Sequence, residues 1–130
     1  MTTYTPNLAV TKEAAEDLSN DRYRFVVVDS DGKVRRPDNA TEQPFGIIQN
    51  APVTGQGASI LPIGCGGSSL VVLGATLDEG VQVAMEYTSA TDAGKAKAAA
   101  SSAYQVGPLL QGGAEDELGE VLLASMTVKA

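Results

Sequence analysis

The chain has 130 residues, a formal net charge of -7 at pH 7 and a pI near 4.4, and it contains no histidine and one cysteine, Cys65. A chain of this length fits one domain with a modest core. The lack of histidine excludes Ser-His-Asp and Cys-His catalysis, and a lone cysteine excludes an intrachain disulfide. The acidic balance argues against direct nucleic-acid binding, and no apolar run is long enough to span a bilayer.

The N-terminal region begins with MTTYTPNLAV, which lacks the basic start and apolar stretch of a signal peptide, so we expect synthesis in a reducing cytoplasm. Residues 1–8 are rich in threonine and contain Pro6, which favours an extended N-terminal arm. Thr11 then has the character of a helix N-cap, and Glu13 suits a first helical turn. This pattern predicts a short N-terminal helix over Lys12–Leu18.

From Tyr23 onward the pattern is that of a β protein. The run Phe25–Val28 is followed by a turn signal at Asp29–Gly32. Short apolar segments separated by glycine and proline predict strands at 25–28, 45–49, 59–63, 70–73, 81–87, 105–111 and 120–128. The alanine-rich stretch Lys95–Ala103 has no large apolar residue, and we expect it to be mostly irregular, with a short helix as the alternative because alanine favours helix. The sequence therefore predicts a mainly all-β single domain over residues 9–130, a small β-barrel or sandwich.

A faint internal repeat divides the chain into pseudo-repeats at about 20–63 and 75–124. Segments of similar sequence recur in the same order about 62 residues apart, with Pro108 as an insertion in the second copy: 31–34 with 93–96, 45–49 with 106–111, and 57–61 with 119–123. Each half has too few strands to close a core alone. Two duplicated halves packed together would remove most exposed strand edges.

Several motifs have the residue types of a chemical site, and each has a simpler interpretation. Gly64–Ser69 lacks the Lys-Ser/Thr ending of a phosphate loop and reads as a link between the halves. Cys65 has no histidine partner. Asp29–Gly32 departs from a calcium loop at its later positions and suits a hairpin turn. The acidic cluster Glu115–Glu120 lies among glycines and suits a solvated loop. We therefore predict no enzyme activity, no cofactor and no metal site.

Four of the nine basic residues are arginines that lie between residues 22 and 36: Arg22, Arg24, Arg35 and Arg36. On an acidic protein this asymmetry is consistent either with a face that meets an acidic partner or with simple solvation.

The whole pattern resembles the small capsid cement, or head decoration, proteins of tailed bacteriophages. The resemblance covers residues 9–124 and depends on the strand following the "DGK" turn, on the "GQG" loop and on their second copies. The segments concerned are Asp31–Lys33, Pro44–Ile48, Gly55–Gly57, Leu73–Val83, Ala93–Ala96, Val106–Leu110 and Gly119–Leu123. The Gly-rich link Gly64–Ser69 and the acidic segment Lys12–Leu18 depart from the family pattern.

The resemblance implies a structural virion protein that is made in the host cytoplasm and binds the capsid exterior. Such a protein stabilises contacts between major capsid subunits, often as a homotrimer; a dimer is the alternative. The capsid-binding residues expected from the arm and the basic cluster are Thr2, Thr3, Tyr4, Thr5, Pro6, Arg35 and Arg36. A rival interpretation is a small β-type module that binds carbohydrate or peptide, although four tyrosines, two phenylalanines and no tryptophan offer few aromatic platforms.

Overall fold

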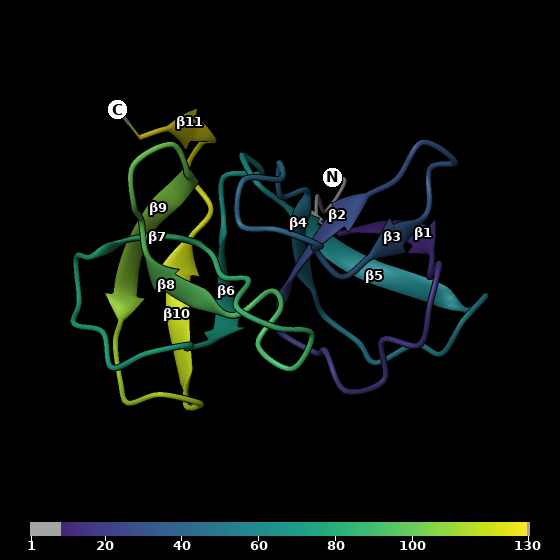
Figure 1. Cartoon of the computed structure of the whole chain (residues 1–130), viewed down its shortest axis with the longest axis horizontal. Coiled ribbons are helices and arrows are strands. Elements are labelled where there is room, and N and C mark those ends of the chain that lie inside the picture. The colour runs from purple at the N-terminus through teal and green to yellow at the C-terminus, as the bar shows by residue number, and fades with distance from the viewer. Residues whose placement is uncertain (1–8, 130) are drawn as a thin grey trace, which may run out of the picture.

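The computed structural model describes residues 9–129, which form an all-β protein (Figure 1). The first half contains five strands: β1 (Val10–Glu13), β2 (Phe25–Val28), β3 (Val34–Arg35), β4 (Gly46–Ile48) and β5 (Gly57–Pro62). The second half contains six: β6 (Ser68–Val72), β7 (Gln82–Met85), β8 (Ala96–Ala98), β9 (Tyr104–Gln111), β10 (Leu118–Leu122) and β11 (Thr127–Val128). Within the described residues no helix is long and apolar enough to cross a membrane.

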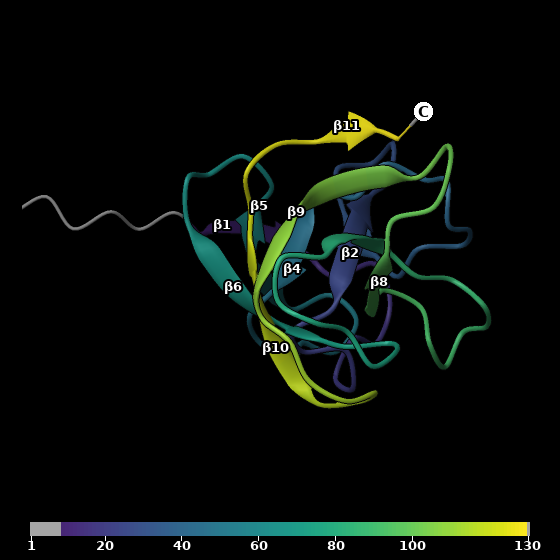
Figure 2. The same ribbon diagram turned by 90° about the vertical axis from the view of Figure 1, so that its left-hand side faces the viewer.

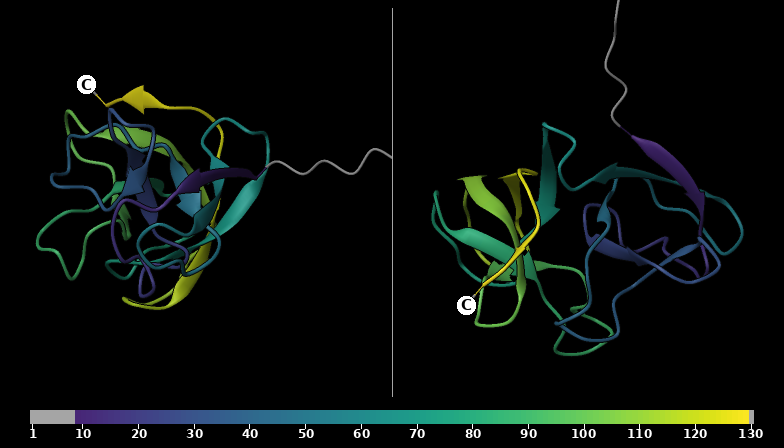
Figure 3. Two further views of the ribbon diagram at one scale, coloured as in Figure 1. Left: turned by 90° about the vertical axis from the view of Figure 1, so that its right-hand side faces the viewer. Right: turned by 90° about the horizontal axis from the view of Figure 1, so that it is seen from above.

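The two halves share one topology. The first sheet has the order β1-β5-β4-β2-β3, and the second has the order β6-β10-β9-β7-β8, with β11 added beside β9. In each half the outer strands also approach each other, because Ala14 forms a parallel bridge with Val34 and Leu73 forms one with Ala96. Each sheet is therefore barrel-like, and the two lie side by side (Figures 1 and 3).

The predicted all-β class is confirmed, and each predicted strand overlaps an observed one. The segment predicted at 120–128 is divided into β10 and β11, since Ala124 and Ser125 turn toward the carbonyl of Val106. The antiparallel pairing of β2 with β3 confirms the hairpin expected at Asp29–Gly32. Within the stretch expected to be irregular, Ala96–Ala98 forms β8 by pairing with β7.

The short helix predicted over Lys12–Leu18 is wrong for the described structure, which has strand β1 at Val10–Glu13 instead. Strand β1 pairs with β5 from Val10↔Ile60 to Glu13↔Gly57. The next backbone groups are taken by the same sheet, because the N–H of Ala14 donates to the carbonyl of Gln56. Ala14 and Leu18 are both buried, so their four-residue spacing reflects two separate core contacts rather than one helical face. Tertiary pairing overrides a weak helical preference.

The core consists of two apolar clusters that meet at the seam between the halves. The first fills the first barrel: Ala14, Leu18, Val26, Val34, Ile48, Ala58 and Ile60. The second fills the second barrel and includes Phe25, Val27 and Ile47 from the first sheet. Because side chains alternate along a strand, β2 buries Val26 inside its own barrel and Phe25 and Val27 against the other. This explains the uninterrupted apolar run of β2.

Backbone contacts also join the halves. The N–H of Phe25 donates to the carbonyl of Gly94 at 2.7 Å, and the N–H of Val72 donates to the carbonyl of Tyr23 at 2.9 Å. Gly94 has a φ of 87°, and a Cβ there would overlap the carbonyl oxygen of Phe25. A glycine is therefore needed where β2 and the β7–β8 connection approach each other.

The strand registers show two bulges in β9. Val121 pairs with Leu109 while Glu120 pairs with Gln111, so β9 bulges at Leu110 on its β10 side, and a shift between Val83 and Ala84 places a second bulge at Val106 on its β7 side. The insertion expected at Pro108 stays a prediction. The predicted repeat boundaries at 20–63 and 75–124 leave out β1 and β6, which are the first strand of each sheet. A common origin of the two halves stays a prediction, and the predicted arm, residues 1–8, lies outside the described residues.

Candidate functional site

The two basic residues expected to bind a capsid, Arg35 and Arg36, are engaged by carboxylates of their own chain. The guanidinium of Arg35 lies 2.5 Å from Glu42 and 3.2 Å from Asp38. The guanidinium of Arg36 lies 2.7 Å from Glu16. It also lies 2.8 Å from Asp21, which is only 3% exposed. These ion pairs connect the end of β3 to the segment after β1 and to the loop before β4.

The electrostatics of this cluster follow from its geometry. The hydrogen bond from Arg35 lowers the pKa of the Glu42 carboxyl and raises that of the guanidinium. Glu42 also accepts hydrogen bonds from the backbone N–H groups of Asp38 and Asn39, which favour its charged form. The cluster is therefore an internal structural network. A docking role for Arg35 and Arg36 stays a prediction, and the other expected capsid-binding residues, Thr2–Pro6, lie outside the described residues.

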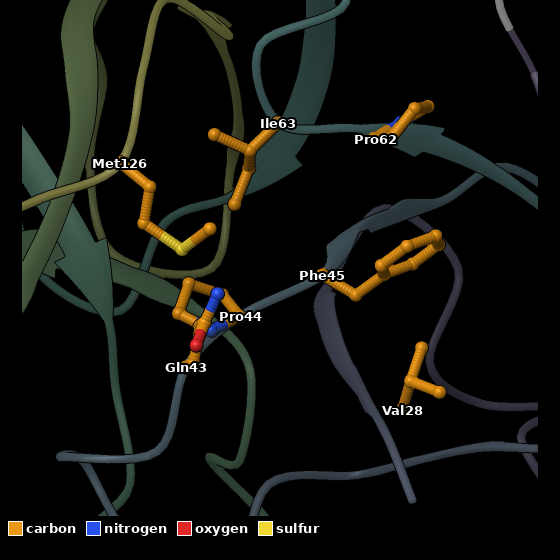
Figure 4. Close-up of a pocket in the computed structure, with 7 residues that line it drawn as sticks. All are labelled: Val28, Gln43, Pro44, Phe45, Pro62, Ile63 and Met126. Atoms are coloured by element: carbon orange, nitrogen blue, oxygen red, sulfur yellow. The ribbon is translucent and has the colours of Figure 1, made fainter. Parts of the chain in front are cut away.

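A pocket lined mainly by apolar residues opens at the seam between the two halves and has a volume of about 410 Å³ (Figure 4). Its walls come from the ends of β2 and β5, the residues before β4 and the segment between β10 and β11. The lining residues are Val28, Gln43, Pro44, Phe45, Pro62, Ile63 and Met126. In Figure 4 the side chains of Phe45 and Val28 lie on one side of the pocket, and those of Ile63 and Met126 lie on the other.

Backbone hydrogen bonds at the strand ends position Phe45 in the wall of this pocket. Phe45 donates its N–H to the carbonyl of Val26 at 2.8 Å, and its own carbonyl accepts from Ile63 at 3.0 Å. The Nζ of Lys12 lies 5.8 Å from the centroid of the Phe45 ring, within cation–π range. None of the lining residues is ionisable, so the pocket suits an apolar side chain of a partner rather than acid–base chemistry.

Sequence reasoning assigned Phe45 and Pro62–Ile63 to strands but missed the pocket, because it treated the residues around Met126 as one continuous strand. The one available signal was an apolar methionine between the polar residues Ser125 and Thr127.

The other motifs noted in the sequence are parts of the fold's connections and ion pairs. Residues 63–67 connect the two sheets, and backbone hydrogen bonds join Gly64 and Gly67 to Leu123. Cys65 is half-buried in this link. In the acidic cluster, Asp116 pairs with the buried Lys95 at 2.6 Å. Within residues 9–129 no group of three or more potential metal ligands gathers.

Comparisons with known proteins show a likeness of fold but not of sequence. No family model matches the sequence, and no curated protein matches it significantly. The arrangement of two barrel-like halves does occur in a solved structure. Among solved structures, the chain is similar to the N base of the head fiber protein gp8.5 of bacteriophage phi29, with a TM-score of 0.64 and 14% sequence identity. The alignment covers 94% of this chain and 98% of the other. At this identity the likeness shows a shared fold.

Proposed function

We propose that the protein is a structural component of a bacteriophage head that binds the outer surface of the shell and stabilises contacts between major capsid subunits. The single observation that carries this proposal is the shared fold with a head fiber base, because the match spans nearly all of both chains. The pattern of glycines, turns and apolar strands that resembles head decoration proteins agrees with this assignment.

The chemistry of the described surface agrees with a binding role. Most residues that line the seam pocket are apolar, and its one aromatic ring, Phe45, is a poor substitute for the aromatic platforms of carbohydrate-binding modules. A protein partner that inserts an apolar side chain suits it better. We further propose that the protein forms a homotrimer on the shell, since subunit contacts would add apolar burial to two small barrels.

The direct test is co-sedimentation of the purified protein with expanded heads of the phage that encodes it, prepared without this protein. We expect saturable binding, and we expect the decorated heads to withstand heating better than bare heads. Heads of an unrelated phage serve as the control. Absence of saturable binding to the cognate heads would overturn the proposal in favour of a ligand-binding module.

The arm provides a second test. Residues 2–6 consist of three threonines, Tyr4 and Pro6. This composition suits an extended arm that adds as a strand to the edge of a neighbouring sheet. Deletion of residues 2–7 should leave the melting temperature unchanged and weaken head binding at least tenfold, which corresponds to about 1.4 kcal/mol. Equal binding by the truncated and full-length proteins would remove the arm from the docking surface.

A further inference from the structure

The outer face of the second sheet carries three exposed leucines on neighbouring strands. Leu70 on β6 is 41% exposed, Leu118 on β10 is 45% exposed and Leu110 at the bulge of β9 is 48% exposed. We call these three residues the leucine patch. Leu70 pairs directly with Glu120, and Leu118 is two residues away on the same face of β10. Singly exposed leucines are ordinary, but here Leu70 and Leu118 are diagonal neighbours on one face, and Leu110 lies beyond Glu120 on the next strand.

The first half provides an internal comparison for this face. The closing bridges at Ala14 and Leu73 align the two halves. In this alignment the pair Thr11↔Ser59 corresponds to Leu70↔Glu120, and the pair Glu13↔Gly57 corresponds to Val72↔Leu118. The positions of Leu70 and Leu118 are thus threonine and glycine in the first half. The fold itself does not require leucine here, so the patch calls for a separate explanation.

The charges around the patch restrict its partner. Between residues 68 and 129 there are eight acidic and three basic side chains. Glu120 lies within the patch and accepts a hydrogen bond from Ser68 at 2.7 Å, while Glu115 and Glu117 lie just before β10. Among residues 9–129 no ion pair involves any of these three glutamates. Two copies meeting patch to patch would bring like charges together, whereas a basic rim on a partner would neutralise them.

The patch and the predicted docking arm belong to different halves of the molecule. Figure 2 looks along the long axis and shows β1 and β6 toward the same edge, whereas Figure 1 shows them well apart along that axis. The predicted docking arm, residues 1–8, joins the chain next to β1, at Ala9. The patch is therefore a surface separate from the point of attachment of the arm.

We propose that the leucine patch is a second docking surface for the head shell, and that it receives an apolar area of the shell protein bordered by lysine or arginine. This inference rests on the proposed function and names the surface that performs it. Burial of the leucines supplies the apolar contact, and the unpaired glutamates select a basic partner. Binding should therefore weaken as the salt concentration rises.

The test compares variants in the head co-sedimentation assay. The double variant Leu70→Thr/Leu118→Thr removes the two neighbouring leucines of the patch, and at position 70 it introduces the residue type that stands at Thr11 in the first half. The variant Glu115→Gln/Glu117→Gln/Glu120→Gln removes the charges while keeping hydrogen-bond acceptors. Val53→Thr is the matched control, because Val53 is 45% exposed in the first half, outside the patch. Circular dichroism melting confirms that each variant folds, and sedimentation velocity gives its oligomeric state.

We expect the leucine double variant to bind heads at least tenfold more weakly, the glutamine variant to lose most of the salt dependence, and Val53→Thr to bind like the wild type. Equal binding by the double variant and the wild type would overturn the patch and leave the proposed function intact. A change of oligomeric state in the double variant would make the patch a self-association surface and overturn the proposal. If the wild type itself does not bind heads, the proposed function fails, and the partner assigned to the patch fails with it.

Discussion

Tyr23 and Gly80 occupy corresponding places in the two halves. The N–H of Tyr23 donates to the carbonyl of Ile48 at 2.8 Å, and the N–H of Gly80 donates to the carbonyl of Leu109 at 2.7 Å. Both residues have a left-handed backbone, with φ values of 65° and 84°. A tyrosine adopts in one half the conformation that glycine adopts in the other, so the topology of the barrel determines the backbone path here.

This relationship predicts a mild effect of Gly80→Ala. A Cβ at Gly80 would meet no atom within 4 Å, so the cost is limited to the left-handed conformation of an alanine. We expect the free energy of unfolding to fall by about 1 kcal/mol in urea titrations followed by circular dichroism.

Gly107→Ala is the contrasting variant. Gly107 has a φ of 152°, and a Cβ there would overlap the carbonyl oxygen of Leu122. We expect this substitution to be clearly more destabilising than Gly80→Ala. Equal losses in the two variants would contradict the assignment of steric contact as the deciding factor.

A second prediction concerns Phe25, whose side chain is fully buried and joins the core cluster of the second barrel from the first sheet. Phe25→Ala should lower the free energy of unfolding by about 3–5 kcal/mol through lost burial and an unfilled cavity. Hydrogen exchange should show reduced protection in both sheets, because the cluster spans them. Phe25→Leu, which keeps most of the volume, should cost much less. Protection that falls in β1–β5 alone would show that the seam does not couple the halves.

The elements that were predictable from sequence are those whose pattern reflects local burial. The run Phe25–Val28 indicates a strand because both faces of β2 are buried. The region around Ala14 was misread because its conformation depends on pairing with β5, more than forty residues away. Long-range pairing leaves little trace in a short sequence window.

The candidate site shows the same limit. The basic cluster was visible in the sequence, but its partners were not, since Glu16 and Asp21 lie 20 and 15 residues from Arg36. The seam pocket was missed because Met126 reaches it only when the chain after β10 folds back toward the first half. The leucine patch needed the strand registers, which show that Leu70 and Leu118 share one face.

A third prediction concerns pH and Glu86. Burial raises the pKa of the Glu86 carboxyl, with a further contribution from the charge of Asp92, and its Oε1 is buried without a hydrogen-bond partner. Because the folded pKa exceeds the unfolded one, the folded state binds this proton more tightly. Its contribution to stability is therefore present below the unfolded pKa and is lost as the pH rises through the folded pKa.

Glu86→Gln should accordingly raise the melting temperature at pH 7 and change it little near pH 4, as measured by circular dichroism. Glu115→Gln, at an exposed position, is the control and should leave the melting temperature nearly unchanged at both pH values. A larger stabilisation by Glu86→Gln at pH 4 than at pH 7 would contradict the assigned direction.

The last prediction separates the structural and docking roles of Arg36. Its guanidinium lies 2.8 Å from the buried carboxylate of Asp21, whose next cationic neighbour, Arg24, is 3.6 Å away. Arg36→Gln leaves Asp21 with this longer pair alone, so we expect the free energy of unfolding to fall by about 2–3 kcal/mol. Arg22→Gln is the control, because its exposed guanidinium donates to the carbonyl of Gln49 and lies over the Tyr23 ring, with no carboxylate partner among residues 9–129. If Arg36 is structural, the folded variant should bind heads as the wild type does. Unchanged stability together with weakened head binding would instead make Arg36 a docking residue.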